Sequence, residues 1–273
     1  MAIKHIAEDI HNFIDLATTA RNKWYSNEAS WGPWFRGHKC ASFDLRPTLY
    51  RYSGDPRSLN GTGRNIEDEL RQEFTMRGPS FTSVQPQTSW DWYFLMQHSG
   101  APTRLLDWTE GALIALYFAL KDNDDKSDAA VWMLDPWWLN GKTLGREEVV
   151  PPGAKIGMSE PDAELYDPWL PNRFDTSKLP KSPVAIYPSH TVPRISSQRS
   201  CFTIHGSDRD GLEALASAQD ARLEKIEIPA SSVRKMNVQL VLCGIDELTI
   251  YPDLDGLGRS LTTTLKLETG RKA

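Results

Sequence analysis

The polar residues between Gln97 and Thr109 form the densest group in this chain that could carry out chemistry. The segment reads QHSGAPTRLLDWT and holds a histidine, an arginine, an aspartate and three hydroxyl residues. An apolar run at 111–120 follows it and is typical of a buried helix. Functional residues are commonly displayed on loops that a rigid element anchors, so we predict a functional turn here. Pro102 with an N-cap at Asp107 or Thr109, and Arg104 as the ion-pair partner of Asp107, would explain part of the pattern by structure alone.

Three further polar positions could join this turn. Arg36 ends a short predicted strand, Gln198 precedes another, and Asp246 or Glu247 supplies a late carboxylate. Arginine binds phosphate through paired hydrogen bonds, and aromatic rings stack on flat heterocycles. Several of the ten tryptophans lie near these positions and could line a pocket or belong to the core, namely Trp31, Trp34, Trp90, Trp92 and Trp108. The combination favours a ligand that carries a phosphate and a flat ring.

Each of these residues also has a purely structural explanation. Arg36 could be a buried arginine paired to Asp44 or Asp107. His98 could be a helix C-terminal histidine that interacts with the helix dipole. Glu247 could be a surface residue. The sequence leaves these alternatives open.

Other kinds of chemistry find little support. There is no phosphate-binding glycine loop, no HExxH and no GxSxG motif. Two sets of carboxylates are interpreted as a solvated helix face (Glu67, Glu69, Glu73) and a loop after a helix (Asp122, Asp124, Asp125). The three cysteines lack metal-ligand spacing, so no metal site is expected. The lack of an acidic metal-binding cluster also disfavours a nuclease or other phosphoester hydrolase.

The charge is unevenly distributed. The net charge of −5 argues against broad binding to nucleic acid. One region is nevertheless rich in cations and could face an anion or be ordinary solvated surface: Arg36, His38, Lys39, Arg46, Arg51, Arg57 and Arg64.

The elements that would position these residues follow from periodicity, caps and breakers. Helices are predicted over residues 4–25, 65–77, 89–98, 109–121, 230–242 and 257–267. Strands are predicted over residues 34–37, 129–134, 201–205, 225–228 and 248–251, and a loop over 52–64. The fold class is α+β, with a helix-rich N-terminal half packed on a modest mixed or antiparallel sheet. Residues 135–190 are rich in Pro and Trp and are predicted to be a long irregular insertion.

Four short motifs resemble the FRG domain family, which is named for a Phe-Arg-Gly triplet. They are WFRGH at 34–38, RPTL at 46–49, HSGAPTRLLDWT at 98–109 and ALYFA at 115–119. The resemblance covers approximately residues 31–120, and weaker similarity to the family occurs at 198–205 and 243–255. Ser200 stands where a glycine is expected. The resemblance implies a single FRG-type domain over residues 1–273 and a bacterial or phage protein encoded near mobile or defence genes. It implies no settled activity.

The candidate site is also remotely similar to the ADP-ribosyltransferase superfamily. That similarity implies that Arg36 holds a ribose or phosphate, that His98 or Thr103 positions a dinucleotide and that Glu247 is the catalytic acid. The chain departs from the superfamily in lacking a Ser-Thr-Ser strand and in the long spacing from His98 to Glu247. We expect catalytic roles for Arg36, His98 and Glu247. We expect contacts to the cofactor from Arg36, Gly37, Thr103, Arg104 and Gln198.

The resulting hypothesis is a nucleotide-binding enzyme, an NAD-dependent ADP-ribosyltransferase or NAD glycohydrolase that acts as a toxin or in phage defence. NAD would be the substrate, with a protein or nucleic acid as the acceptor of any transferred ADP-ribose. The alternative is a non-catalytic sensing module for a phosphorylated ligand or a phage protein. The longest apolar run is too short to cross a membrane and the N-terminus does not resemble a signal peptide, so a cytoplasmic location is expected.

Overall fold

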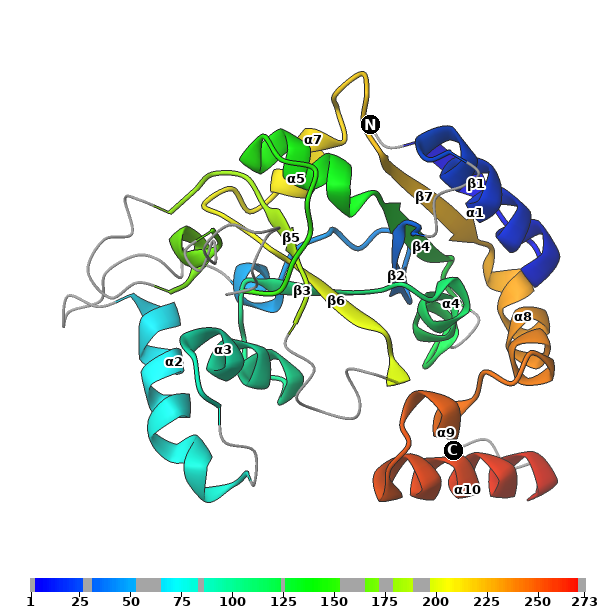
Figure 1. Cartoon of the computed structure of the whole chain (residues 1–273). Coiled ribbons are helices and arrows are strands. Elements are labelled where there is room, and N and C mark those ends of the chain that lie inside the picture. The colour runs from blue at the N-terminus through cyan, green and yellow to red at the C-terminus, as the bar shows by residue number, and fades with distance from the viewer. Residues whose placement is uncertain are drawn as a thin grey trace.

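The computed structural model describes residues 3–26, 31–52, 65–82, 86–123, 126–152, 165–171, 179–188 and 197–269. A sheet of seven strands, counted over these residues, runs through the centre of the molecule (Figure 1). The strands are β1 (Ile3–Ile6), β2 (Trp34–His38), β3 (Leu105–Thr109), β4 (Ala129–Leu134), β5 (Val184–Ile186), β6 (Ser200–Ile204) and β7 (Leu223–Ile228). The helices are α1 (Ile10–Trp24), α2 (Ile66–Arg77), α3 (Ser89–His98), α4 (Ala112–Leu120), α5 (Pro136–Leu144), α7 (Gly211–Leu215), α8 (Ala230–Leu242), α9 (Glu247–Ile250) and α10 (Leu254–Thr269). Short 3₁₀ turns occur at Thr48–Arg51, Gly78–Ser80 and Asp167–Trp169.

The sheet is mixed, and its strand order is β1-β7-β4-β2-β3-β6-β5. β1 runs parallel to β7, whereas the other described pairs are antiparallel. This arrangement confirms the predicted α+β class with a mixed sheet. Strands from Ile3 to Ile228 therefore share one sheet, although more than 200 residues separate the two ends in sequence.

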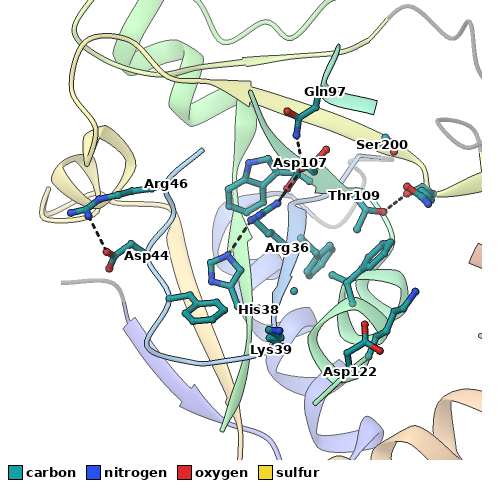
Figure 2. Close-up of a pocket in the computed structure, with 18 of the residues that line it drawn as sticks. Arg36, His38, Lys39, Asp44, Arg46, Gln97, Asp107, Thr109, Asp122 and Ser200 are labelled. Carbon is teal, nitrogen blue, oxygen red and sulfur yellow. Dashed lines mark hydrogen bonds and ion pairs between the residues drawn. The ribbon is translucent and has the colours of Figure 1, made fainter. Parts of the chain in front are cut away.

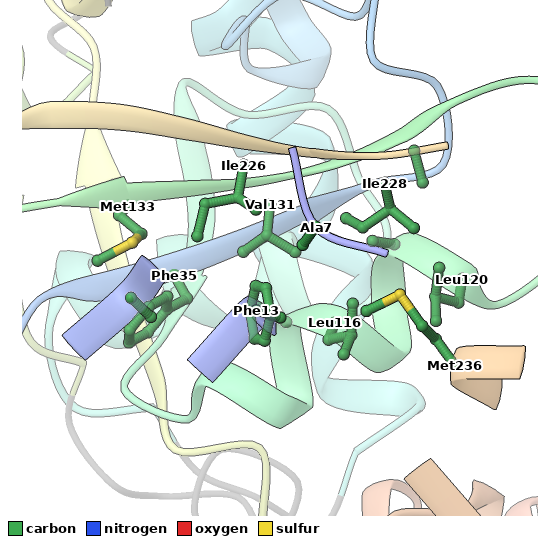
Figure 3. Packing of buried hydrophobic residues seen from close by; sticks show 14 of the residues in the cluster. Ala7, Phe13, Phe35, Leu116, Leu120, Val131, Met133, Ile226, Ile228 and Met236 are labelled. Atoms are coloured by element: carbon green, nitrogen blue, oxygen red, sulfur yellow. The ribbon is translucent and has the colours of Figure 1, made fainter. Parts of the chain in front are cut away.

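Helices cover both faces of the sheet because successive strand residues point to opposite sides. On one face α1, α4 and α8 pack against strands β2, β4 and β7 (Figure 3). The labelled members of this core include Phe13, Phe35, Leu116, Val131, Ile226 and Met236. The opposite face packs against α5 and α7 through Trp34, Trp132 and Trp138. A third cluster joins α3 to β3, β5 and β6.

Elements with strong local signals match the prediction. Asn65 caps α2 by accepting a hydrogen bond from the Asp68 amide, and Thr88 and Asp91 form a capping box at α3. β2, β4, β6, β7, α8 and α10 also lie where predicted, within a few residues. The predicted loop at 52–64 lies almost entirely outside the described residues.

Three predicted elements are wrong in type or extent. The first residues of the predicted helix 4–25 form β1, and α1 begins only after its N-cap Asp9. The predicted helix 109–121 begins at Ala112, because Leu105–Thr109 is drawn into the sheet as β3. The predicted strand 248–251 is helix α9, whose cap Asp246 accepts from the Thr249 amide.

The segment 135–190 is more regular than predicted. It contains α5, capped by Asp135 and started by Pro136, and the strand β5. Residues 153–164 and 172–178 lie outside the described part. Within the described part, the prediction of a wholly irregular insertion is therefore wrong.

Candidate functional site

A cavity of about 860 Å³ opens where β2 and β3 separate. The two strands meet at one register position, Phe35 opposite Thr109. Beyond it β2 continues beside β4 and β3 continues beside β6, so the sheet splits into a notch. The cavity extends from this notch to α3, α4 and the segment after α9 (Figure 2).

The guanidinium of Arg36 spans this notch. Its Nη1 donates to the carbonyl oxygen of Asp107 at 2.6 Å and lies 3.7 Å from the Asp107 carboxylate. Its Nε donates to Nε2 of His38 at 3.1 Å. Burial lowers the pKa of Arg36 to about 10, so the side chain stays charged at neutral pH. Arg36 is therefore a fixed cation whose side chain is 15% exposed at the base of the cavity.

His38 is a neutral support for this cation. Burial lowers the pKa of His38 to about 3, and the Arg36 charge acts in the same direction. The ring therefore accepts a hydrogen bond from Arg36 without competing for charge. Phe43 packs edge-on against the same ring, with 6.2 Å between centroids.

The opposite side of the notch presents a carboxylate. The side chain of Asp107 is 57% exposed, and its Oδ2 accepts from Nε2 of Gln97 at 2.8 Å. Gln97 in turn accepts from the hydroxyl of Thr103, which is fully buried. Thr103 therefore acts behind the pocket wall by orienting Gln97.

Positive charge dominates the rest of the cavity wall. Four more lining residues are cationic, namely Lys39, Arg46, Arg51 and Lys121, against the acids Asp44, Asp107 and Asp122. Arg46 bridges to Asp44 at 3.5 Å and to Asp210 at 2.5 Å, which holds it at the rim. Aromatic rings also line the cavity: Phe43, Trp108, Phe118 and Tyr251.

Two non-glycine residues with positive φ lie at the cavity. Asp122 has φ of 56° and lines it, and Arg199 has φ of 47° between the lining residues Gln198 and Ser200. The family resemblance led us to expect a tight turn with a glycine at position 200. The chain does turn here, and the residue in the left-handed conformation is Arg199. Such backbone costs about 1–3 kcal/mol and is concentrated at functional sites.

The structure brings four of the predicted site residues to this cavity, namely Arg36, Gly37, His98 and Gln198. Gly37 has a packing reason of its own, because a Cβ there would overlap the Ala115 carbonyl and the Ala119 amide of α4. The segments 35–37 and 97–109 lie side by side, as the sequence led us to expect.

Thr103, Arg104 and Glu247 do not line the cavity. Arg104 is 1% exposed and donates to both oxygens of Glu67 at 2.8 Å. The structural alternative that paired Arg104 with Asp107 is therefore wrong, and so is the solvated position predicted for Glu67. Glu247 lies one layer behind the wall, where Tyr117, Lys121 and Arg259 bind its carboxylate.

Several lining residues were not singled out as site residues. Lys39, Arg46 and Arg51 belong to the cation-rich region noted in the sequence, which was the available signal. Of the tryptophans considered as pocket residues, Trp108 lines the cavity. Tyr251 lies in the segment of weaker similarity to the family at 243–255, which was its available signal, whereas Lys121 gave no sequence signal and reaches the cavity only in the folded chain. No group of three potential metal ligands occurs among the described residues.

Comparison with known families supports the resemblance to the FRG domain family. Residues 32–128 match the family model of the FRG domain. The matched segment contributes most of the cavity, from Phe35 to Asp122, whereas Gln198, Ser200 and Tyr251 come from outside it. No curated protein and no solved structure matches the chain. No described helix is long and apolar enough to span a bilayer.

Proposed function

We propose that the cavity between β2 and β3 binds an anionic nucleotide, with NAD as the leading candidate. The observation that carries this proposal is the fixed Arg36 guanidinium at the base of a cavity with further cations on its walls. Arginine recognises phosphate through directed, charge-assisted hydrogen bonds. The chain as a whole is acidic, so the local positive charge is a specific feature that would attract an anion.

The aromatic lining supports a ligand with a flat ring. Phe43 is 48% exposed, and it lies beside the cationic part of the wall. Tyr251 contributes a second ring to the cavity lining. A base stacked on such a ring gains about 1–3 kcal/mol.

We further propose that bound NAD is cleaved at the bond between nicotinamide and ribose. In this step water or an acceptor group attacks the anomeric carbon, and the electrons of the carbon–nitrogen bond leave with nicotinamide. The proton of the nucleophile passes to a base or to solvent. A carboxylate near the ribose would stabilise the positive charge that develops there. Asp107 suits this role better than Glu247, because its carboxylate lines the cavity whereas that of Glu247 is held behind the wall.

The decisive test combines calorimetry with NAD and an assay for nicotinamide release. Arg36→Gln should weaken NAD binding by about 10–100-fold, the effect of losing a charged hydrogen-bond donor. Arg77→Gln is the matched control, because Arg77 is an exposed residue of α2 whose ion pair with Glu73 lies outside the cavity. Absence of NAD binding by the wild-type protein would refute the proposal.

Asp107→Asn separates catalysis from binding. It keeps the hydrogen-bonding shape of the side chain and removes its charge. It should lower nicotinamide release by roughly 10²–10³-fold with little change in NAD affinity. Binding of NAD by the wild type without any release would instead identify a sensing module.

NAD cleavage would make the protein toxic to the cell that expresses it. Wild-type expression should then arrest growth, and Arg36→Gln should relieve the arrest. Growth arrest that persists in soluble Arg36→Gln would point to a different toxic activity.

A further inference from the structure

Tyr251 of the C-terminal segment (residues 247–259) and Lys121 lie next to each other in one part of the cavity wall, which we name the far wall. Tyr251 lines the cavity from the link between α9 and α10, and Lys121 lines it from the end of α4. Figure 1 shows α9 and α10 outside the helix layers that cover the sheet. Something must therefore hold this segment against the cavity.

Glu247 makes the polar side-chain contacts of this segment with α4, and Ser197 and Gln198 donate to the carbonyl oxygen of Ile250. The Glu247 carboxylate accepts hydrogen bonds from the hydroxyl of Tyr117 and from Nε of Arg259, and Nζ of Lys121 lies at 3.3 Å. These partners come from α4 and α10, so Glu247 of α9 links all three helices. Burial alone would raise the pKa of Glu247, but its donors outweigh this effect and lower it. The carboxylate is therefore ionised at neutral pH.

The two cations bound by Glu247 also contact the ring of Tyr251. Nζ of Lys121 lies 4.4 Å and Cζ of Arg259 lies 4.6 Å from the ring centroid. A cation near the face of an aromatic ring is attracted by its quadrupole. By fixing both cations, Glu247 fixes the ring of Tyr251, which lines the cavity.

Apolar packing also attaches this segment, because Phe118 of α4 packs edge-on against Tyr251 with 6.4 Å between the ring centroids. Ile250 is fully buried and anchors α9. On α10, however, the leucines are largely exposed: Leu254 at 84%, Leu257 at 40% and Leu261 at 62%. The N-terminal part of α10 instead approaches the backbone of Tyr251 so closely that a Cβ at Gly256 would overlap the Tyr251 carbonyl oxygen.

We propose that Glu247 is a positioning residue that closes the nucleotide cavity by holding Tyr251 and Lys121 in its far wall. This inference rests on the proposed function of the cavity. It gives Glu247 no contact with the reacting atoms. The ion pairs of Glu247 then keep the C-terminal segment in place at the cavity. Loss of these ion pairs weakens ligand binding and leaves the rate of the bond-breaking step unchanged.

Two variants test this role by different physical means. Glu247→Gln removes the charge that holds both cations. Gly256→Ala touches no charge but pushes α10 away from Tyr251. Gly258→Ala is the matched control on the same helix, because a Cβ there meets nothing within 4 Å.

Hydrogen exchange and kinetics are then measured on all three variants. Glu247→Gln and Gly256→Ala should both speed amide exchange in residues 247–259 and leave exchange in β2 and β4 unchanged. Both should raise the Kd for NAD by about 10-fold, the effect of losing ring–cation contacts of moderate strength. The kcat for nicotinamide release should stay within about twofold of the wild type. Gly258→Ala should behave as the wild type.

Opposite results would overturn the proposal. If Glu247→Gln lowers kcat by about 10²-fold at unchanged Kd, Glu247 is catalytic. Unchanged exchange in Glu247→Gln would show that Glu247 does not hold the segment. If wild-type protein fails to bind NAD, the proposed function falls. The exchange data then still decide whether Glu247 fastens the wall.

Discussion

Arg104 and Glu67 form an ion pair in the interior of the protein. The side chains are 1% and 5% exposed. The guanidinium of Arg104 also donates to the carbonyl oxygens of His205 and Trp169, and the hydroxyl of Tyr93 donates to Glu67. Burial raises the pKa of Tyr93 well above its usual value, so this phenol remains a donor. The network ties α2, α3 and β3 together.

Glu67→Gln should therefore lower the free energy of unfolding by about 3–5 kcal/mol, because it leaves the buried charge of Arg104 uncompensated. Urea unfolding measures this change. Glu73→Gln is the control on the same helix, where a half-exposed pair with Arg77 should contribute less than about 1 kcal/mol. Equal effects of the two substitutions would contradict the structural role of the Glu67 pair.

Residue types alone could not separate Arg36 from Arg104. Both arginines lie next to short apolar segments, and both were predicted to contact a nucleotide. The difference is the partner: Arg104 meets Glu67 from a helix 37 residues earlier in the sequence, whereas Arg36 meets the backbone of Asp107 at an open notch. Those partners are set by tertiary structure.

At the scale of elements, Gly37 determines how closely α4 packs on β2. A Cβ at this position would overlap backbone atoms of Ala115 and Ala119. Gly37→Ala should therefore destabilise the protein by about 1–3 kcal/mol or more, the usual effect of overpacking against atoms that cannot rotate away. Thermal melts measure this effect.

Gly32→Ala provides the control for this substitution. A Cβ at Gly32 meets nothing within 4 Å, so the substitution should change stability by less than about 0.5 kcal/mol. A stable Gly37→Ala protein with an unaltered cavity would show that α4 can move without cost.

Elements were predictable from sequence where their signals are local. Capping residues and apolar periodicity identified α2, α3 and α8. β1 and β3 were mistaken because their type is decided by distant partners, whereas the short helix α9 was mistaken although its cap Asp246 is a local signal. β3 pairs with β2 and β6, and β1 pairs with a strand some 220 residues away. The cavity depends on these same long-range pairings, so its position could be anticipated but its full lining could not.

At the scale of the whole molecule, two buried histidines should make the fold sensitive to acid. Burial lowers the pKa of both His38 and His205 to about 3 from an ordinary value of 6.5. Between these values the unfolded chain binds protons that the folded chain does not. Stability should therefore fall as pH decreases from about 6.5 towards 3, by roughly 1.4 kcal/mol per pH unit for each proton taken up.

Unfolding by urea at neutral and mildly acidic pH tests this expectation. His38→Gln should reduce the pH dependence by the contribution of one proton. The exposed His11 offers the control, since His11→Gln should leave the pH dependence unchanged. A stability that does not vary below pH 6.5 would mean that these rings are protonated in the folded protein.

The wide sequence span of the cavity has a consequence for protein synthesis. The first lining residue of the cavity is Phe35 and the last is Tyr251. β2 lies between β4 and β3 in the sheet, and both of these strands are synthesised after it. Domains generally fold as units while the chain leaves the ribosome, N-terminal parts first. A nascent chain that has released only the FRG-matched segment lacks Gln198, Ser200 and Tyr251 and holds an incomplete binding site. Translation products truncated before Tyr251 should consequently be inert, and ligand binding should begin only after Tyr251 has emerged.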